Sequence, residues 1–317
     1  MKIAIIGAFS DKLSTLHGLT SGLQELGHTW VPIESKPQQS PVNIKTPAFA
    51  DYVAKQSQDC DTLLIGKGTT IPIHIYNLII EKCHDTTFLT FDSVSGGGCG
   101  PPNRPLELGP RGLLCDRIIL TGTEGARWFR ENGYDRPIAQ IFQGHRPSIW
   151  YPGDLPREEK DQISFLGNHY SGDGGRRGKI KALANAGFNI HYSRRCFHRE
   201  ASQLYWESSI NLNLVCGDLI SNRLWRILAS GGFALTEDNA DINHVFTDGK
   251  EVAICRQNDA DHLIEVAQFY RNRRDLREEI SYRGQEWSKG YTWVRQAEKM
   301  VKFVSGNSVE VDGAAKL

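Results

Sequence analysis

The chain has 317 residues, which is more than a single hydrophobic core commonly supports and enough for two domains of about 150 residues each. Lys plus Arg and Asp plus Glu number 37 each, so no global positive field is present to hold an anionic polymer. The apolar runs are only strand-sized, which argues against a membrane span, and the seven cysteines show no C-x-x-C spacing of a zinc or redox site.

The first half of the chain alternates strand-like and helix-like segments. Residues 2–7 read as a strand, and the leucines of 13–26 recur at helical spacing until Gly27 ends the helix. Because this first segment is a strand rather than an apolar leader, we expect a cytoplasmic protein. Further strands are predicted at 29–33, 62–66, 87–91 and 117–121, with helices at 49–58 and 73–83.

The alternation is interrupted twice. Between residues 92 and 112 a Gly- and Pro-rich stretch predicts a long loop, a feature that is usually functional or disordered. Residues 150–160 carry prolines and a charge run, which predicts a linker between domains. After the linker the strand and helix alternation resumes and continues to a last helix at 294–304.

This pattern predicts an α/β protein with two Rossmann-like parallel-sheet domains facing across a cleft. We expect the first domain at 1–150 and the second at 151–290. Residues 291–317 would form a C-terminal helix packing back toward the first domain and a frayed tail. Ligands in such sheets bind beyond the carboxyl ends of the strands.

One glycine-rich segment follows a predicted strand and precedes a predicted helix. Glycines allow backbone N–H groups to approach a phosphate, and the helix N-terminus adds partial positive charge. Cations at that end disfavour the helix unless an anion offsets them. The alternative is a flexible turn with solvated arginines. The candidate phosphate-binding residues here are Gly167, Asn168, Gly174, Arg176 and Arg177.

A second segment predicts a short helix followed by a strand. Ser221 or Asn222 can cap the helix, and Arg223 and Arg226 share one helical face. Two guanidinium groups on one face favour a diphosphate clamp, against the alternative of a solvated charged edge.

Here the sequence resembles a known family. The pieces are Ile210-Asn-Leu-Asn, Gly217-Asp, Ser221-Asn-Arg-Leu-Trp-Arg-Ile-Leu-Ala-Ser-Gly-Gly and Val245-Phe-Thr-Asp-Gly-Lys, preceded by Gln143-Gly-His-Arg-Pro. Their order and spacing resemble the spore-maturation (CgeB-like) branch of glycosyltransferases with the GT-B fold, over about half the chain. The resemblance implies a nucleotide-diphosphate sugar in the second domain, an acceptor in the first, and no separate cofactor.

One position departs from the family pattern. Where relatives place a glutamate for the nucleotide ribose, this chain has Arg226, which can only donate hydrogen bonds. Either Arg226 binds phosphate or the donor is unusual. Asp218, Glu237 or Asp238 are the candidates for the missing carboxylate.

Sugar transfer also needs a group that removes a proton from the acceptor hydroxyl. Asp92, at the end of a strand, and His17, at the start of the first helix, are the candidate bases; a turn residue and a surface histidine are their alternatives. No D-x-D triplet or His/Asp cluster with ligand spacing occurs, so we expect no metal.

Three alternatives stay open at this point. The acceptor is undefined, and a hydroxylated base in DNA is one option because arginines group at 194–199 and 271–274. A non-catalytic two-lobed binding protein and a sugar-nucleotide epimerase are the other functions compatible with two α/β domains. The sequence does not define the oligomeric state.

Overall fold

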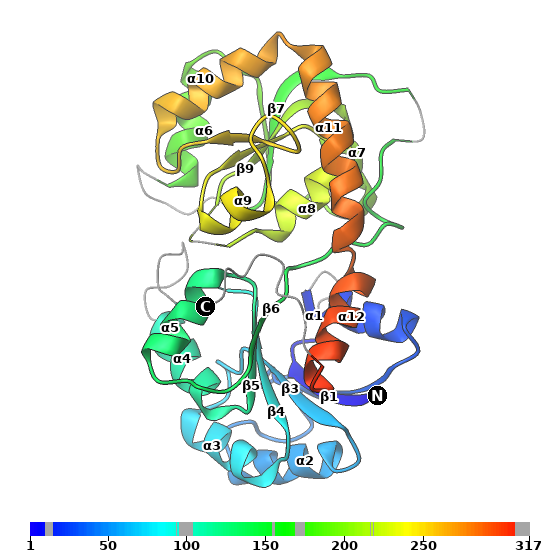
Figure 1. The fold of residues 1–317 in the computed structure, drawn as a ribbon, viewed down its shortest axis with the longest axis vertical. Helices are drawn as coiled ribbons and strands as arrows, with labels where there is room; N and C mark the ends of the chain where they lie inside the picture. Colours follow the sequence, from blue (N-terminus) through cyan, green and yellow to red (C-terminus); the bar gives the residue numbers. More distant parts are fainter. Residues whose placement is uncertain are drawn as a thin grey trace. The chain divides into compact units, whose positions relative to one another are not determined.

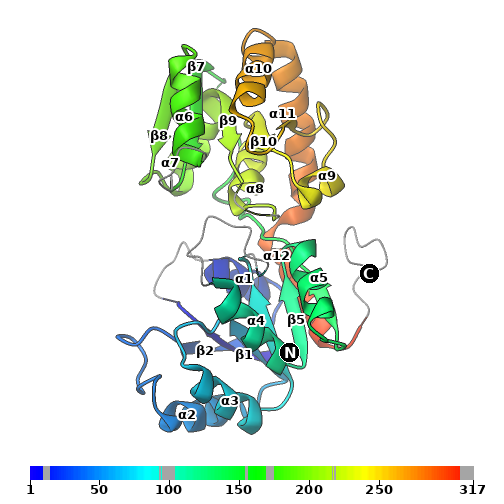
Figure 2. The same cartoon turned by 90° about the vertical axis from the view of Figure 1, so that its left-hand side faces the viewer.

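A computed structural model describes residues 1–9, 15–92, 94, 104–153, 156–168, 175–215, 217 and 219–307. The chain forms two compact units, each drawn in Figures 1 and 2. The first unit comprises residues 1–144 and the segment that begins at Trp293, and the second comprises residues 145–292. Trp150 belongs to the second unit, where it packs on Tyr205 with ring centroids 6.2 Å apart.

The first unit is a six-stranded sheet in the order β2-β1-β3-β4-β5-β6, and all its described strand pairs are parallel. Its strands are β1 (Lys2–Gly7), β2 (Thr29–Glu34), β3 (Thr62–Gly66), β4 (Thr86–Thr90), β5 (Arg117–Leu120) and β6 (Ile138–Gln140). Its helices are α1 (Thr15–Glu25), α2 (Pro47–Ser57), α3 (Ile73–Lys82), α4 (Arg104–Leu114), α5 (Thr123–Glu131) and α12 (Trp293–Val304).

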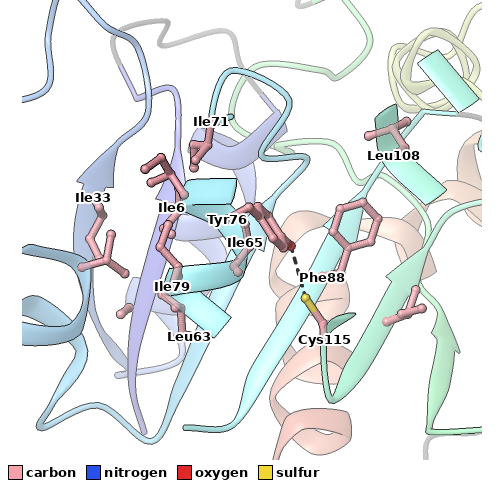
Figure 3. Packing of buried hydrophobic residues seen from close by; sticks show 14 of the residues in the cluster. Ile6, Ile33, Leu63, Ile65, Ile71, Tyr76, Ile79, Phe88, Leu108 and Cys115 are labelled. Atoms are coloured by element: carbon pink, nitrogen blue, oxygen red, sulfur yellow. Dashed lines mark hydrogen bonds between the residues drawn. The ribbon is translucent and has the colours of Figure 1, made fainter. Parts of the chain in front are cut away.

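Helices cover both faces of this sheet because the strands are apolar on both sides. Ala4 and Ile6 of β1 belong to one buried cluster, and Ile3 and Ile5 belong to another. The first cluster includes residues of α2 and α3 and is shown in Figure 3. Within it the Tyr76 hydroxyl lies 3.2 Å from Cys115 Sγ. Alternate residues of one strand thus serve two cores, as a doubly wound sheet requires.

Helix α12 completes the second of these cores by packing on α1. A β-carbon on Gly18 would lie 2.3 Å from the Trp293 indole nitrogen, and one on Gly22 would lie 2.4 Å from the Trp293 carbonyl oxygen. The two glycines, four residues apart on one helical face, therefore allow the close approach of the helices. Helix α12 is in this way part of the first unit.

The second unit is a five-stranded sheet in the order β11-β10-β9-β7-β8, again with parallel described pairs. Its strands are β7 (Lys160–Leu166), β8 (Ile190–Ser193), β9 (Ser208–Asn213), β10 (Ala234–Glu237) and β11 (Ala253–Cys255). Its helices are α6 (Arg176–Asn185), α7 (His198–Glu207), α8 (Asn222–Ala229), α9 (Ala240–Val245), α10 (Ala260–Arg271) and α11 (Arg274–Ser288), followed by a 3-10 turn at Lys289–Tyr291.

Three elements differ from the sequence prediction. Helix α4 occupies part of the stretch predicted as a loop, with Pro110 inside it. Its glycines allow neighbouring aromatic rings to approach: a β-carbon on Gly109 would lie 2.2 Å from Trp128, and one on Gly112 would lie 2.4 Å from Phe129. The two glycines thus indicate close packing of a helix against aromatic rings rather than irregular chain. The short elements β6 and α9 were not predicted, since three and six residues carry little periodic signal.

Candidate functional site

The second sheet has a point where its strand order reverses. Strand β7 lies between β8, which follows it in sequence through α6, and β9, on its other side. The loops that follow β7 and β9 therefore leave the sheet in opposite directions. Such a switch point, at the carboxyl ends of the strands, is where open α/β sheets bind ligands.

Arg223, in the first turn of α8, lies at this switch point. Its Nε donates to the carbonyl oxygen of Leu166 at 2.7 Å, at the end of β7, and its Nη1 donates to that of Leu214 at 3.3 Å, just after β9. The guanidinium carbon lies 4.5 Å from the centre of the Phe165 ring. The side chain therefore spans the two diverging loops and rests on an aromatic face.

Gly167 makes this position possible. A β-carbon there would stand 2.5 Å from Arg223 Nη2, and the backbone has a φ of +142°, which side chains rarely adopt. The glycine thus permits both the turn after β7 and the close approach of the guanidinium group.

Arg176, the first residue of α6, meets Arg223 at the same carbonyl. Its Nε donates to Leu214 O at 2.9 Å, and its Nη1 donates to Asn168 O at 3.1 Å. Two guanidinium groups thus share one backbone acceptor. Burial, and secondly the positive charge of Arg176, lower the pKa of Arg223 to about 10. Arg223 stays charged at neutral pH, and among the described residues no carboxylate pairs with it.

The N-termini of α6 and α8 are close to these arginines in sequence. The N-cap residues Gly175 and Ser221 make no side-chain capping hydrogen bond. The capping role predicted for Ser221 is therefore wrong, because its hydroxyl donates to Asn213 Oδ1 at 2.6 Å instead. First-turn N–H groups without a side-chain cap suit an anion, which would also balance the paired guanidinium groups.

The other predicted phosphate-site residues have different surroundings. Arg177 is exposed, and no hydrogen bond or ion pair of its side chain to a described residue is found. Asn168 accepts a hydrogen bond from Arg194 Nε through Oδ1 at 3.1 Å, and Asn222 is half-buried at the start of α8. Gly174 and Asp218 lie outside the described residues.

Arg226 faces a neighbouring aromatic ring. Its guanidinium carbon lies 4.9 Å from the centre of the Trp150 ring. Its positive charge is the second cause, after burial, that lowers the pKa of His145 to about 4. Whether it contacts phosphate, as one reading of the sequence expects, stays a prediction.

Glu237, a candidate for the ribose contact, is almost fully buried at 1% exposure. Its carboxylate pairs with Lys179 of α6 and accepts hydrogen bonds from the backbone N–H groups of Val215 and Asn258, at 3.0 and 3.1 Å. Its direct ribose contact stays a prediction, whereas these partners tie the carboxylate to the loops around the arginines.

The first unit also has a cavity, of about 330 Å³, at its own switch point. Its lining includes Ala8 after β1, Gly66 and Lys67 at the end of β3, and Phe91 and Asp92 after β4. The Lys67 ammonium lies 2.6 Å from the Asp92 carboxylate. Lys67 was not singled out from the sequence, and its φ of +57° turns the chain directly after the strand. The carboxyl ends of three strands thus form one pocket around an ion pair.

His17, the second candidate base, is placed differently. It is half-buried on α1, and its carbonyl accepts a hydrogen bond from the Thr20 hydroxyl at 3.2 Å. It is not part of the cavity lining, whereas the preceding Thr15 and Leu16 are. The structure therefore places Asp92, and not His17, on the wall of this cavity.

The described residues contain neither a metal-ligand cluster nor a membrane-spanning helix. No group of three or more His, Cys, Asp or Glu side chains there has the proximity needed to hold a metal ion. No helix in the same part of the chain combines the length and apolarity needed to cross a bilayer.

Residues 154–302 match the family described as "Glycosyl transferase-like". The chain resembles glycosyltransferases. Sucrose-phosphate synthase from Thermosynechococcus elongatus superposes with a TM-score of 0.71 at 10% identity, covering 96% of this chain and 98% of that one. HepE from Anabaena, in complex with UDP and glucose, gives a TM-score of 0.71 at 9% identity, covering 96% and 100%.

A glycosyltransferase from Rickettsia africae gives a TM-score of 0.69 at 12% identity, covering 97% of this chain and 99% of that one. The fold is therefore that of the GT-B glycosyltransferases, as predicted. Among curated proteins no sequence matches the chain significantly.

Proposed function

We propose that this protein transfers a sugar from a nucleotide-diphosphate sugar to an acceptor hydroxyl. The observation that carries the proposal is Arg223: a half-buried guanidinium at the switch point, held by two carbonyls beside Arg176 and paired with no carboxylate among the described residues. A pyrophosphate would supply the missing negative charge, and the matched family and the GT-B fold support a transferase. Within that fold we propose the spore-maturation branch.

The proposed chemistry needs positive charge where the donor breaks. The bond between the anomeric carbon and the diphosphate oxygen breaks, and the bond from that carbon to the acceptor oxygen forms. The leaving diphosphate gains negative charge, which Arg176, Arg223 and the N-terminus of α8 would stabilise. These groups can supply the charge that a divalent cation provides elsewhere, so we propose a metal-independent transfer. The acceptor proton passes to a base.

We propose Asp92 as that base, with the acceptor bound in the first-unit cavity. The cavity volume of about 330 Å³ lies at the small end of the range for sites that hold small molecules. Its wall combines Leu16, Leu89 and Phe91 with the Lys67–Asp92 pair, so it suits a small ring that carries hydroxyl groups. This favours a small acceptor, or one base extruded from a polymer, over a long chain lying in the cavity.

The arginine groups that raised DNA as an acceptor are largely committed within the protein. Arg199 donates to the carbonyls of Tyr151 and Pro152 at 2.7 and 3.1 Å. Arg271 pairs with Asp161, and Arg274 pairs with Glu278. These contacts weaken the case for DNA, which remains the second acceptor candidate. We keep the cytoplasm as the proposed location.

The experiment is a thermal-shift and donor-hydrolysis screen of the full chain with nucleoside diphosphates and their sugars. UDP and UDP-glucose come first, because HepE from Anabaena, which shares the fold, forms a complex with UDP-glucose. We expect one nucleotide to raise the melting temperature and Arg223→Ala to abolish that rise. A screen in which no nucleotide stabilises the protein would contradict the proposal. Binding of a nucleotide sugar without turnover would favour a non-catalytic binding protein. Conversion of the sugar on its nucleotide, without transfer to an acceptor, would favour an epimerase.

A further inference from the structure

A buried ion pair contacts the peptide group that binds both arginines. Lys179 Nζ and the Glu237 carboxylate are in contact, with side-chain exposures of only 6% and 1%. The pair joins α6 to the end of β10. A buried pair of this kind seldom adds net stability, because desolvating both charges costs about as much as their attraction returns. Its placement therefore calls for another explanation.

The explanation lies in one peptide group. Glu237 Oε2 accepts the N–H of Val215 at 3.0 Å. That N–H belongs to the same peptide unit as the carbonyl of Leu214, which accepts hydrogen bonds from both Arg176 and Arg223. In a trans peptide the N–H and C=O groups point in opposite directions. By accepting the Val215 N–H, the carboxylate fixes the orientation of this peptide. The carbonyl oxygen of Leu214 then faces the two guanidinium groups.

The same carboxylate also ties down the next loop. Glu237 Oε1 accepts the N–H of Asn258 at 3.1 Å, while the Lys179 ammonium donates to Asn258 Oδ1 at 3.1 Å. Asn258 has a φ of +60°, in the left-handed region that residues other than glycine seldom adopt. Lys179 itself lies one turn after Arg176 on α6. The loops after β9 and β11 and the start of α6 are thus anchored at one carboxylate.

We propose that Glu237 is a positioning residue of the pyrophosphate site, acting through the Leu214–Val215 peptide on Arg176 and Arg223, with Lys179 as its counter-ion. The inference rests on the proposed function. A negative charge on the N–H side polarises the peptide and strengthens the carbonyl as an acceptor. The polarised Leu214 carbonyl thus orients the two arginines and partly offsets their charge in the ligand-free protein. Because the Glu237 carboxylate is buried, no exposed negative charge is present there to repel a phosphate.

The test compares Glu237→Gln with Glu159→Gln in the full-length protein, using UDP and inorganic pyrophosphate as probes. Glu159 is the matched control, a partly buried carboxylate of the same unit, with 10% side-chain exposure, that contacts both Arg157 and Arg277. Both variants lose an ion pair to a buried cation, Lys179 or Arg277, and should melt lower. Only Glu237→Gln should weaken UDP binding, by about tenfold, the loss that a misplaced charge-assisted hydrogen bond brings.

A double-mutant cycle measures the coupling between Glu237 and Arg223 in UDP affinity, which a purely structural role of Glu237 would not produce. If Glu237 acts through the arginines, its substitution should cost much less UDP affinity in an Arg223→Ala background than in the parent. Equal losses in both backgrounds, or equal losses for Glu237→Gln and Glu159→Gln, would overturn the inference. Should Glu237→Gln not fold, Lys179→Met/Glu237→Gln removes the unpaired ammonium and is expected to show the same UDP defect.

The two proposals fail in different ways. If the parent protein binds UDP and Glu237→Gln binds it equally well, only the positioning role is lost. If the parent binds neither UDP nor pyrophosphate, nor any other nucleotide of the screen, the proposed function and the positioning role both fail.

Discussion

The Arg223 guanidinium lies against Gly167 so closely that a β-carbon on residue 167 would stand 2.5 Å from Nη2. The contact joins the end of β7 to the start of α8, and it places a cation where the backbone of a glycine-rich loop begins. Because Gly167 has no side chain, the charged group of Arg223 can occupy this position.

Replacing Gly167 with alanine should weaken nucleotide binding and lower stability. The new methyl group would displace Arg223 from the Leu166 carbonyl, and the φ of +142° would strain any side chain. We expect the free energy of unfolding to fall by about 1–3 kcal/mol, with a loss of UDP affinity of roughly tenfold. Urea unfolding and calorimetric titration with UDP measure the two effects.

Gly187→Ala is the control for this substitution. Gly187 also has a positive φ, of +84°, but a β-carbon there would meet no atom within 4 Å. It should therefore lose stability through backbone strain alone and keep its affinity for UDP. If both variants lose UDP affinity alike, the contact between residues 167 and 223 is not what organises the site.

The two adjacent arginines of α6 should differ sharply in importance. Arg176 donates to Leu214 O and Asn168 O, whereas Arg177 is exposed. Arg176→Ala should therefore reduce UDP affinity by about tenfold or more, since hydrogen bonds to charged groups are worth about 1.5–3 kcal/mol. Arg177→Ala should change it less than twofold. The reverse order in a titration with UDP would show that Arg177 contacts the phosphates.

The contrast between these arginines also shows what the sequence could and could not predict. Alternating apolar segments and glycine-terminated helices were enough to predict two parallel-sheet units, because both signals are local. The pairing of Arg176 with Arg223 was within reach as well, since both follow strands that the pattern brings to one sheet edge. Which of two consecutive arginines turns inward depends on the helix start, and boundaries are the least reliable part of such predictions.

Other parts of the site depend on contacts between residues distant in sequence. Glu237 ends a strand, as a ligand-binding carboxylate would, and its engagement by Lys179 and Val215 becomes visible only when α6 and β9 are placed beside β10. Lys67 was not predicted as a site residue because a lysine after a strand is common and its partner Asp92 is 25 residues away in the sequence. Arg226 was identified as a departure from the family pattern, but its stacking on Trp150 follows from the tertiary fold.

Asp92→Asn should impair transfer without affecting donor binding. An amide cannot take up the acceptor proton, so turnover should fall by about 100-fold or more, while UDP affinity, set in the second unit, should stay the same. Release of UDP from UDP-glucose, with water as acceptor, measures turnover without knowledge of the natural acceptor. Asp51→Asn is the control, since it removes the Asp51–Lys82 ion pair on the surface of the same unit. Normal turnover in Asp92→Asn would exclude this residue as the base.

His145 should make the stability of the second unit depend on pH. Its Nε2 lies 3.0 Å from the carbonyl of Ser288, and its Nδ1 is buried with no partner among the described residues. Burial, followed by the charge of Arg226, lowers the pKa of the imidazole from 6.5 to about 4. Between pH 6.5 and about 4, His145 is therefore protonated in the unfolded chain but neutral in the folded protein. The stability that neutral His145 contributes is complete above pH 6.5 and is lost as the pH falls toward 4.

The loss attributable to this one group is on the order of 3 kcal/mol, because each pKa unit corresponds to about 1.4 kcal/mol. Urea unfolding at pH 7.5 and 4.5, followed by tryptophan fluorescence, measures it. His145→Asn keeps a donor toward Ser288 but cannot be protonated, so its stability should decline less between the two pH values. His74→Gln, at an exposed position of α3, corrects for the loss of a histidine elsewhere. If the parent protein and His145→Asn decline equally, the buried imidazole is not the group that senses acid.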